Sequence, residues 1–202
     1  MKIGLVPMAA KPYHAGHHWL VEQAAGENDK VILFVSVSDR KRKGELPILG
    51  ADMVQVWQEE LEAIMPGNVE VKYGGSPVQK VYQEIQEAGL DGSTDVYYVY
   101  SDAQDTAQNY PEANRLKWME PLYTLGQVKF PAETNPKRFT RGSGSPNISG
   151  TAMRGAMETC DIDAFRAGLP KGVDADNVYN ILCGRSIKGE NLLRIYVQSL
   201  LD

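Results

Sequence analysis

Cysteine is scarce in this chain, which has only two in 202 residues. Cys160 and Cys183 stand far apart, so their number and spacing support neither a disulfide scaffold nor a cysteine zinc cluster. Both fall in or beside segments with a helical pattern, where a free thiol behaves as a small apolar side chain. We therefore predict that both cysteines are buried and that the protein works in a reducing compartment.

Long apolar runs and an excess of positive charge are lacking as well. No stretch approaches the roughly 20 apolar residues that a membrane-spanning helix needs, and no leader-like basic and apolar region opens the chain. The net charge is −5 and the pI is near 5.3, whereas a non-specific binder of DNA or RNA needs a basic face. We expect a soluble cytoplasmic protein that binds neither membranes nor nucleic acid.

The overall composition is that of an ordinary globular protein, with 43% apolar and 23% charged residues. A chain of this length can bury one sizeable core. We predict a single domain over residues 1–202, with a helical C-terminal part from about residue 160.

Apolar segments without helical spacing alternate with one-sided helical patterns along most of the chain. The predicted strands are residues 2–8, 30–38, 69–73, 95–100 and 127–131. Helices are predicted from about Gly16 and over 51–64, 78–87, 151–157, 162–169, 175–182 and 191–201. This alternation predicts an α/β fold with a parallel sheet covered by helices on both faces. Ligands of such sheets bind at the carboxyl ends of the strands, where the strand order reverses.

All three histidines fall within five positions of the segment KPYHAGHHWL, directly after the first predicted strand. A strand-to-helix turn presents unpaired backbone N–H groups and the positive end of a helix dipole, so an anion is its natural ligand. His14 and His17 are three residues apart and face the same side. Gly16, between them, lets a phosphate approach the backbone.

His18 is predicted to lie on the helix surface. A zinc site at the His14/His17 pair is an alternative, but no third ligand is spaced nearby.

The HAGH tetrapeptide resembles the HxGH signature of the nucleotidyltransferase superfamily of adenylyl- and cytidylyltransferases. Far downstream, ISGTAMR at residues 148–154 resembles the family's ISxTxxR motif and again opens a helix after a Gly/Ser/Pro-rich loop. The resemblance implies a Rossmann-like, doubly wound, five-stranded sheet in the order 3-2-1-4-5 with C-terminal helices. The chain departs from the family where a glycine and a phenylalanine are common, since Met8 and Ala10 stand there.

The resemblance also implies roles for the matching residues. His14 and His17 would donate to the α- and β-phosphates, and Arg154 would bind the β- and γ-phosphates. The nucleotide-binding positions would be Met8, Ala9, Ala10, Lys11, Gly16, Ser149 and Thr151. A largely hydrated Mg²⁺ would accompany the triphosphate, with no dedicated protein metal site.

Each of these residues has a structural alternative. Arg154 can be a surface residue of its helix, and Ser149 and Thr151 can be helix caps. Trp57 and Trp118 can stack on a base, although packing is the favoured interpretation.

Three further segments are open to either interpretation. Within the basic run DRKRK, Lys43 is a candidate phosphate contact, or the run is a solvated loop. Asp102, with Asp105, follows the fourth strand and either contacts ribose or acceptor or begins a turn. The loop over residues 135–147 is flexible enough to be a lid.

The motif variants look most like those of nicotinamide mononucleotide adenylyltransferases, because cytidylyltransferases tend to carry RTxGIST. We therefore expect transfer of AMP from ATP to a phosphorylated acceptor, with release of pyrophosphate. Nicotinamide mononucleotide is the first choice of acceptor, before phosphopantetheine, a sugar phosphate or a polyol phosphate. The alternatives are a cytidylyltransferase that uses CTP and a non-catalytic nucleotide-binding regulator. Relatives commonly assemble into homo-oligomers, but the sequence identifies no contact surface.

Overall fold

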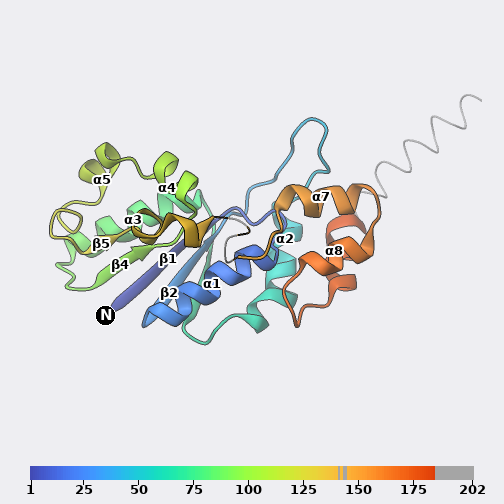
Figure 1. Cartoon of the computed structure of the whole chain (residues 1–202), viewed down its shortest axis with the longest axis horizontal. Helices are drawn as coiled ribbons and strands as arrows, with labels where there is room; N and C mark the ends of the chain where they lie inside the picture. Colours follow the sequence, from blue (N-terminus) through green and yellow to red (C-terminus); the bar gives the residue numbers. More distant parts are fainter. Residues whose placement is uncertain (141, 143–144, 185–202) are drawn as a thin grey trace, which may run out of the picture.

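The computed structural model describes residues 1–140, 142 and 145–184, and its centre is one five-stranded sheet (Figure 1). The strands are β1 (Lys2–Met8), β2 (Lys30–Val35), β3 (Val69–Tyr73), β4 (Val96–Val99) and β5 (Val128–Lys129). They lie in the order β3-β2-β1-β4-β5, and every neighbouring pair is parallel. The predicted fold class and strand order are therefore confirmed. β1 and β4 are the neighbours between which the strand order reverses.

Helices cover both faces of the sheet because alternate strand residues point to opposite sides. Val6 and Leu33 belong to the core on one face, whereas Leu5 and Phe34 belong to the core on the other. The first face is covered by α1 (Ala15–Glu27), α2 (Gly50–Val56), α7 (Gly150–Glu158), α8 (Ile162–Gly168) and the helical residues 175–184. The second face is covered by α3 (Pro77–Leu90), with α5 (Glu112–Trp118) packed beside it.

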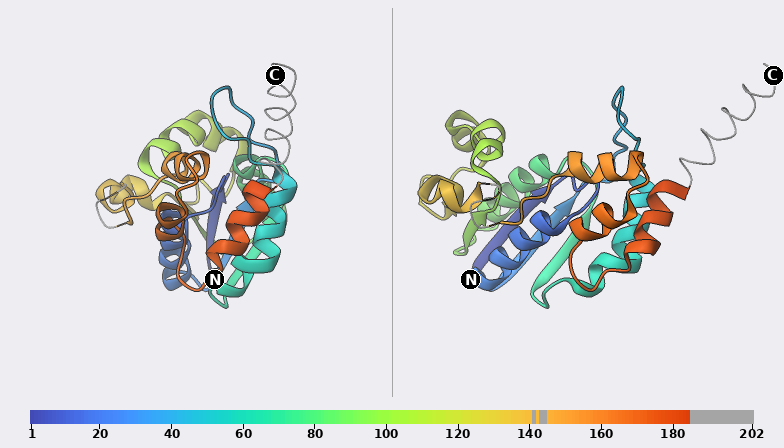
Figure 2. Two further views of the ribbon diagram at one scale, coloured as in Figure 1. Left: turned by 90° about the vertical axis from the view of Figure 1, so that its right-hand side faces the viewer. Right: turned by 45° about the vertical axis from the view of Figure 1, so that its right-hand side comes forward.

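The C-terminal helices pack beside α2 and the turns that follow it, as both views of Figure 2 show. Asn177 donates from its side-chain amide to Glu60 over 2.7 Å, and the backbone N–H of Asp174 donates to the same carboxylate over 3.0 Å. Phe165 and Met157 are buried in the same core as Trp57. The described C-terminal helices thus share one core with the sheet. None of the described helices is long and apolar enough to cross a membrane.

Several predicted boundaries are wrong for identifiable reasons. The predicted helix 51–64 is α2 followed by a π-helical turn (Trp57–Leu61) and a 3-10 turn (Glu62–Ile64). α3 runs through Gly89 and ends before Gly92, whose φ of +67° suits the turn that follows a helix. β5 is only two residues long, because Pro131 already begins α6 (Pro131–Thr134).

Two connections hold more structure than the sequence pattern predicts. α4 (Ala103–Asn109) and α5 follow β4, where no helix was predicted. The first part of the predicted 135–147 loop is a 3-10 helix (Pro136–Phe139), whose Arg138 binds Gln23 and Glu27 of α1. This part of the predicted flexible loop therefore has helical structure, while residues 141, 143 and 144 lie outside the described residues, and a lid stays a prediction. So does the predicted helix 191–201.

The prediction that both cysteines are buried is half right. Cys183 is buried in the core, and burial raises the pKa of its thiol to about 11. Cys160 is exposed. It follows Thr159, the C-cap of α7, and has a φ of +54°, so it belongs to the turn that leaves the helix and not to its packed face.

Candidate functional site

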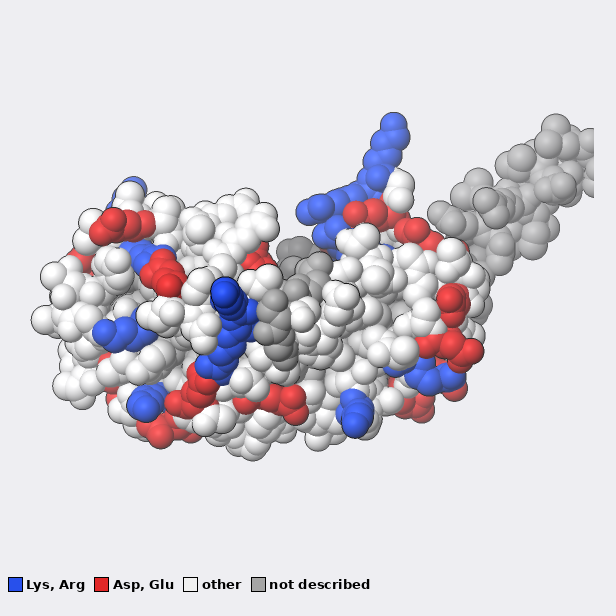
Figure 3. Space-filling view, viewed as in Figure 1, with Lys and Arg blue, Asp and Glu red and all other residues white. Residues whose placement is uncertain are grey.

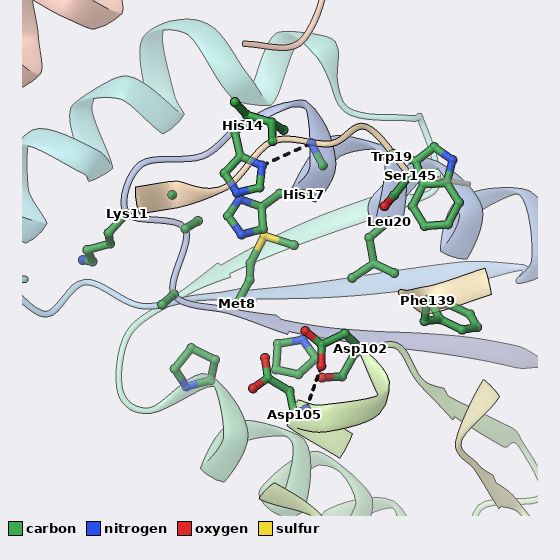
Figure 4. A pocket seen from close by; sticks show the side chains of 18 of the residues that line it. Met8, Lys11, His14, His17, Trp19, Leu20, Asp102, Asp105, Phe139 and Ser145 are labelled. Atoms are coloured by element: carbon green, nitrogen blue, oxygen red, sulfur yellow. Dashed lines mark hydrogen bonds between the residues drawn. The ribbon is translucent and has the colours of Figure 1, made fainter. Parts of the chain in front are cut away.

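A cavity of about 460 Å³ opens at the carboxyl ends of β1 and β4, where the strand order reverses (Figure 4). The turn after β1, the first turns of α1 and α4, and the beginning of α7 line it. Most of the residues predicted for the site lie in this lining, namely Met8, Ala9, Ala10, Lys11, His14, Gly16, His17, Asp102 and Arg154. Two motifs that are more than 130 residues apart in sequence therefore meet at one cavity.

The turn between β1 and α1 holds its backbone in an unusual shape. Ala10 has a φ of +49°, which is costly for a residue other than glycine and is kept only when the surroundings impose it. Ala10 is buried, and so is Tyr13, whose ring contacts the Trp57 ring edge-on at 4.8 Å between centroids. Trp57 thus packs in the core beneath this turn, which agrees with the favoured interpretation of packing and not with stacking on a base.

His14 is the N-cap of α1, and its Nδ1 accepts a hydrogen bond of 3.1 Å from the backbone N–H of Gly16. Because Nδ1 acts as acceptor in this bond, the ring proton of neutral His14 belongs on Nε2. The rings of His14 and His17 are stacked with centroids 3.8 Å apart, so the pair forms one unit at the beginning of the helix. A Cβ on Gly16 would come within 3.1 Å of the His14 ring, which explains why a glycine separates them.

The Lys11 side chain is bound to the backbone. Its Nζ donates to the carbonyl oxygen of Ser36 over 3.0 Å and to that of Ser38 by a shorter contact. Burial lowers the pKa of Lys11, although the nearby Asp39 carboxylate opposes this. The ammonium therefore ties the turn after β1 to the chain leaving β2, and the predicted phosphate contact by Lys11 would have to compete with these two carbonyls.

Arg154 extends from α7 to the turn after β1 and is almost fully buried, with 5% of its surface exposed. Its Nη1 donates to the Lys11 carbonyl oxygen over 3.0 Å, and its Nη2 donates to Thr151 Oγ1 over 3.1 Å. A Cβ on Gly150 would lie 3.1 Å from Nη1. Burial, assisted by the charge of Arg40, lowers the pKa of Arg154. The surface alternative for Arg154 is wrong.

The remaining predicted phosphate contacts do not line the cavity. Ser149 caps α7, and its Oγ accepts from the backbone N–H of Ala152 over 3.1 Å. Thr151 holds Arg154, and Lys43 is exposed outside the lining. Arg40, from the same basic run as Lys43, lines the cavity instead. The phosphate contact by Lys43 stays a prediction, and Arg40 is the member of the basic run that lies at the cavity.

The wall opposite the histidines is acidic and polar. Asp102 caps α4 by accepting from the backbone N–H of Asp105 over 2.7 Å, and both carboxylates line the cavity (Figure 4). Burial and the charge of Asp102 raise the pKa of Asp105. Tyr110 is buried in the same wall, and its hydroxyl has no hydrogen-bond partner among the described residues. One wall therefore suits an anion, and the other suits a hydroxyl-bearing or cationic group.

Trp19 and Trp118 differ in their position relative to the cavity. Trp19 lines the main cavity and also a second one of about 680 Å³, and the sequence pattern gave no signal for it beyond its place in the KPYHAGHHWL segment. Trp118 is 41% exposed and lies under the ammonium of Lys117, away from the cavity lining.

His18 lies outside the lining of the main cavity and lines the second one. Its Nδ1 is 3.2 Å from the Tyr13 hydroxyl, and burial lowers its pKa. Within the described parts of the chain, no group of three or more histidine, cysteine, aspartate or glutamate side chains could hold a metal ion.

The segment that carries the histidines matches known proteins. Residues 3–66 match the profile of the citrate lyase ligase C-terminal domain. A curated [Citrate [pro-3S]-lyase] ligase of Klebsiella pneumoniae is 44% identical over 61 residues, which cover 26% of this chain and 18% of that protein. The match thus spans less than a fifth of the relative's length. The residues 3–66 that match the citrate lyase ligase C-terminal domain include β1, the histidine turn and the loop with Arg40.

Among solved structures, the chain is similar to Thermotoga maritima TmcAL bound with alpha-thio ATP. The similarity covers 94% of this chain and 56% of that one, with 15% identity and a TM-score of 0.40. A likeness of this degree has no bearing on the ligand or the activity.

Proposed function

We propose that this protein is a nucleotidyltransferase that moves AMP from ATP to an acceptor and releases pyrophosphate. The observation that carries the proposal is the convergence of His14, His17 and Arg154 on one cavity, at the reversal of strand order in a parallel sheet. The match of residues 3–66 to the citrate lyase ligase C-terminal domain supports it further.

The reaction is an in-line attack of an acceptor oxygen on the α-phosphorus. A phosphate or carboxylate acceptor is already anionic, so the protein needs no strong base. Its work is to align two anions that repel each other and to stabilise charge that builds on the phosphate oxygens. His14 and His17 are the donors for the α- and β-phosphates, and the Arg154 guanidinium binds the phosphates that leave.

A magnesium ion belongs with the triphosphate in this proposal. Phosphate oxygens and water are its natural ligands, since Mg²⁺ keeps several waters. Asp102 and Asp105 line the same cavity and offer the oxygen atoms that this ion prefers. The ion would supply charge neutralisation at the phosphates.

Two classes of acceptor fit this reaction. Nicotinamide mononucleotide is the first candidate, because the motifs resemble those of its adenylyltransferases. The Klebsiella pneumoniae relative is named a ligase, which favours a second candidate in which the attacking oxygen is that of a carboxylate. The acidic wall with Asp102 and Asp105 suits an acceptor with hydroxyl groups or a positive charge.

Pyrophosphate release tests the proposal. The purified protein is incubated with Mg²⁺ and each of the four ribonucleoside triphosphates, against nicotinamide mononucleotide, other phosphorylated metabolites and small carboxylates such as citrate. We expect turnover with ATP that disappears in Arg154→Ala and persists in Lys30→Ala, a surface cation at the far end of β2. Turnover with CTP alone would assign cytidylyl transfer. Tight ATP binding without turnover on any acceptor would assign a regulator.

A further inference from the structure

The chain leaving β2 forms a hairpin-like loop at the mouth of the cavity. Arg40 and Ile48 close its base with two backbone hydrogen bonds of 2.8 and 3.0 Å. The residues between them, which we name the 40–48 loop, project from the body of the protein (Figure 1). Figure 3, in the same view as Figure 1, shows Lys and Arg side chains gathered on this projection. Residues 41–43 of the loop are Lys, Arg and Lys, and all three are exposed.

The Glu45 carboxylate of this loop lies between two arginines of the cavity. Its Oε2 accepts from Arg40 Nε over 2.9 Å, and its Oε1 accepts from Arg40 Nη2 over 3.1 Å. The same Oε2 is 3.1 Å from Nε of Arg154. Arg40 and Arg154 both line the cavity, whereas Glu45 does not. Two guanidinium groups from distant parts of the chain thus converge on a single internal anion.

The two guanidinium groups of Arg40 and Arg154 together favour a compact anion with several oxygen atoms. Two guanidinium charges repel each other, and the charge of Arg40 contributes to the lowered pKa of Arg154. A carboxylate satisfies this demand, and so does a phosphate, because the guanidinium fork pairs with either in the same two-bonded way. A phosphate also brings more charge and more acceptor oxygens than Glu45 does.

We propose that Arg40 and Arg154 together form a binding site for a phosphate group of the polyphosphate, and that Glu45 is the internal occupant which this phosphate displaces. The identity of the polyphosphate as a nucleoside triphosphate rests on the proposed function. The competition between Glu45 and an inorganic polyphosphate does not.

The surroundings of Glu45 allow it to leave while the arginine stays. The Glu45 side chain is 29% exposed, whereas that of Arg154 is 7% exposed and is fixed by the Lys11 carbonyl oxygen and Thr151. Gly44, next to Glu45, has a φ of +79°, which only glycine adopts readily. The partly exposed Glu45 side chain thus borders solvent, and its carboxylate would regain water on leaving the two arginines.

Glu45 competes with an external anion for Arg40 and Arg154. It lowers the apparent affinity for that anion, because the anion binds only in the fraction of molecules in which Glu45 does not occupy the site. Removal of the Glu45 charge at constant shape should therefore tighten polyphosphate binding. Removal of Arg40 should weaken it. The same substitutions should leave the affinity for a nucleoside monophosphate unchanged, since AMP lacks the phosphate groups beyond the first.

Isothermal titration with inorganic tripolyphosphate, ATP and AMP provides the test. We expect Glu45→Gln to bind tripolyphosphate and ATP about three-fold or more tighter than wild type, and Arg40→Gln to bind both about ten-fold or more weaker. Glu70→Gln is the matched control, because it removes one surface carboxylate, paired with Lys30 on the far edge of the sheet, and changes the net charge equally. Glu45→Ala serves as a second variant should Glu45→Gln fold poorly by circular dichroism.

The outcomes separate this proposal from the proposed function. Equal tripolyphosphate affinities of Glu45→Gln and Glu70→Gln would overturn it, as would a tighter binding of AMP by Glu45→Gln. If Glu45→Gln binds tripolyphosphate more tightly but no acceptor supports pyrophosphate release, the arginine site stands and the transferase assignment fails. If turnover occurs but Glu45→Gln leaves polyphosphate binding unchanged, the transferase assignment stands and the proposed displacement of Glu45 fails.

Discussion

The guanidinium of Arg154 donates to the backbone carbonyl oxygen of Lys11 over 3.0 Å, and this bond joins the two halves of the candidate site. Arg154 lies in the middle of α7, and Lys11 lies in the turn that leads from β1 to the histidines. The bond fixes how far the cationic group lies from His14 and His17.

Replacement of Arg154 by lysine should abolish most activity although the charge remains. A single ammonium cannot at once bind the Lys11 carbonyl oxygen, Thr151 and an anion in the geometry of the guanidinium fork. We expect pyrophosphate release by Arg154→Lys to fall on the order of 100-fold or more. Arg166→Lys is the control, because Arg166 is an exposed residue of α8 that pairs with Asp163 and Asp176. A loss of less than about three-fold in Arg154→Lys would contradict the role given to Arg154.

Replacement of His14 by asparagine should separate its capping role from its chemical one. Asparagine caps helices well, so it can keep a bond to the Gly16 backbone N–H. His14→Asn should retain the stability of wild type, while His14→Ala should lose about 1 kcal/mol of unfolding free energy. Both variants should lose transferase activity on the order of 100-fold, because both lack the ring. Urea denaturation and pyrophosphate release measure the two effects, and full activity in His14→Asn would exclude the ring from catalysis.

A methyl group at Gly150 should weaken triphosphate binding without destabilising the fold. Its Cβ would come within 3.1 Å of Arg154 Nη1 and 3.6 Å of the Lys11 carbonyl oxygen, so the guanidinium must shift. Alanine is otherwise a better helix residue than glycine, by about 1 kcal/mol. Gly155→Ala in the same helix is the matched control, since its Cβ would meet nothing within 4 Å. We expect a raised KM for ATP in Gly150→Ala alone, and equal KM values in the two variants would refute the expectation.

Trp57 should matter for stability and Trp118 should not. Trp57 is fully buried against Tyr13, beneath the turn that carries the histidines. Trp57→Ala should therefore lose about 3–5 kcal/mol of unfolding free energy. Trp118→Ala, at a position that is 41% exposed, should lose less than about 0.5 kcal/mol. Urea denaturation of the two variants decides the matter, and similar losses would show that Trp57 is not a core residue.

The ionisation of Glu45 gives the stability a pH dependence. Burial opposes its charge, but the hydrogen bonds from Arg40 and the charge of Arg154 prevail and lower its pKa below the ordinary value of 4.5. Because the pKa of Glu45 is lower in the folded protein than in the unfolded chain, its carboxylate stabilises the fold at pH values above the unfolded pKa. This stabilisation is lost as the pH falls through the folded pKa. Wild type should melt at a higher temperature than Glu45→Gln at pH 7, and the difference should shrink below pH 4.5. A constant difference down to pH 3 would contradict this.

The histidine turn and the alternation of strands with helices were predictable because each follows from local patterns, whereas the strand order was predicted only from the resemblance of the two motifs to a known superfamily. An apolar strand, a turn with Gly16 and a one-sided helix are readable within twenty residues, and their repetition indicates a parallel sheet. The helices α4 and α5 were not predictable in this way, because their sequences carry no clear apolar stripe. Arg40 was missed because its charge alone does not distinguish it from Lys43.

The sequence by itself determined the kind of fold and the place on it where an anion can bind, since strand periodicity and the residues at the beginning of α1 are local properties. Tertiary structure alone decided how the cationic side chains are arranged at the cavity. Lys11 is bound by the carbonyl groups of Ser36 and Ser38, while Arg40 and Arg154 line the cavity and are held by Glu45. The reason is physical. The direction of a long charged side chain depends on partners far away in the sequence, and only packing brings them within bonding distance.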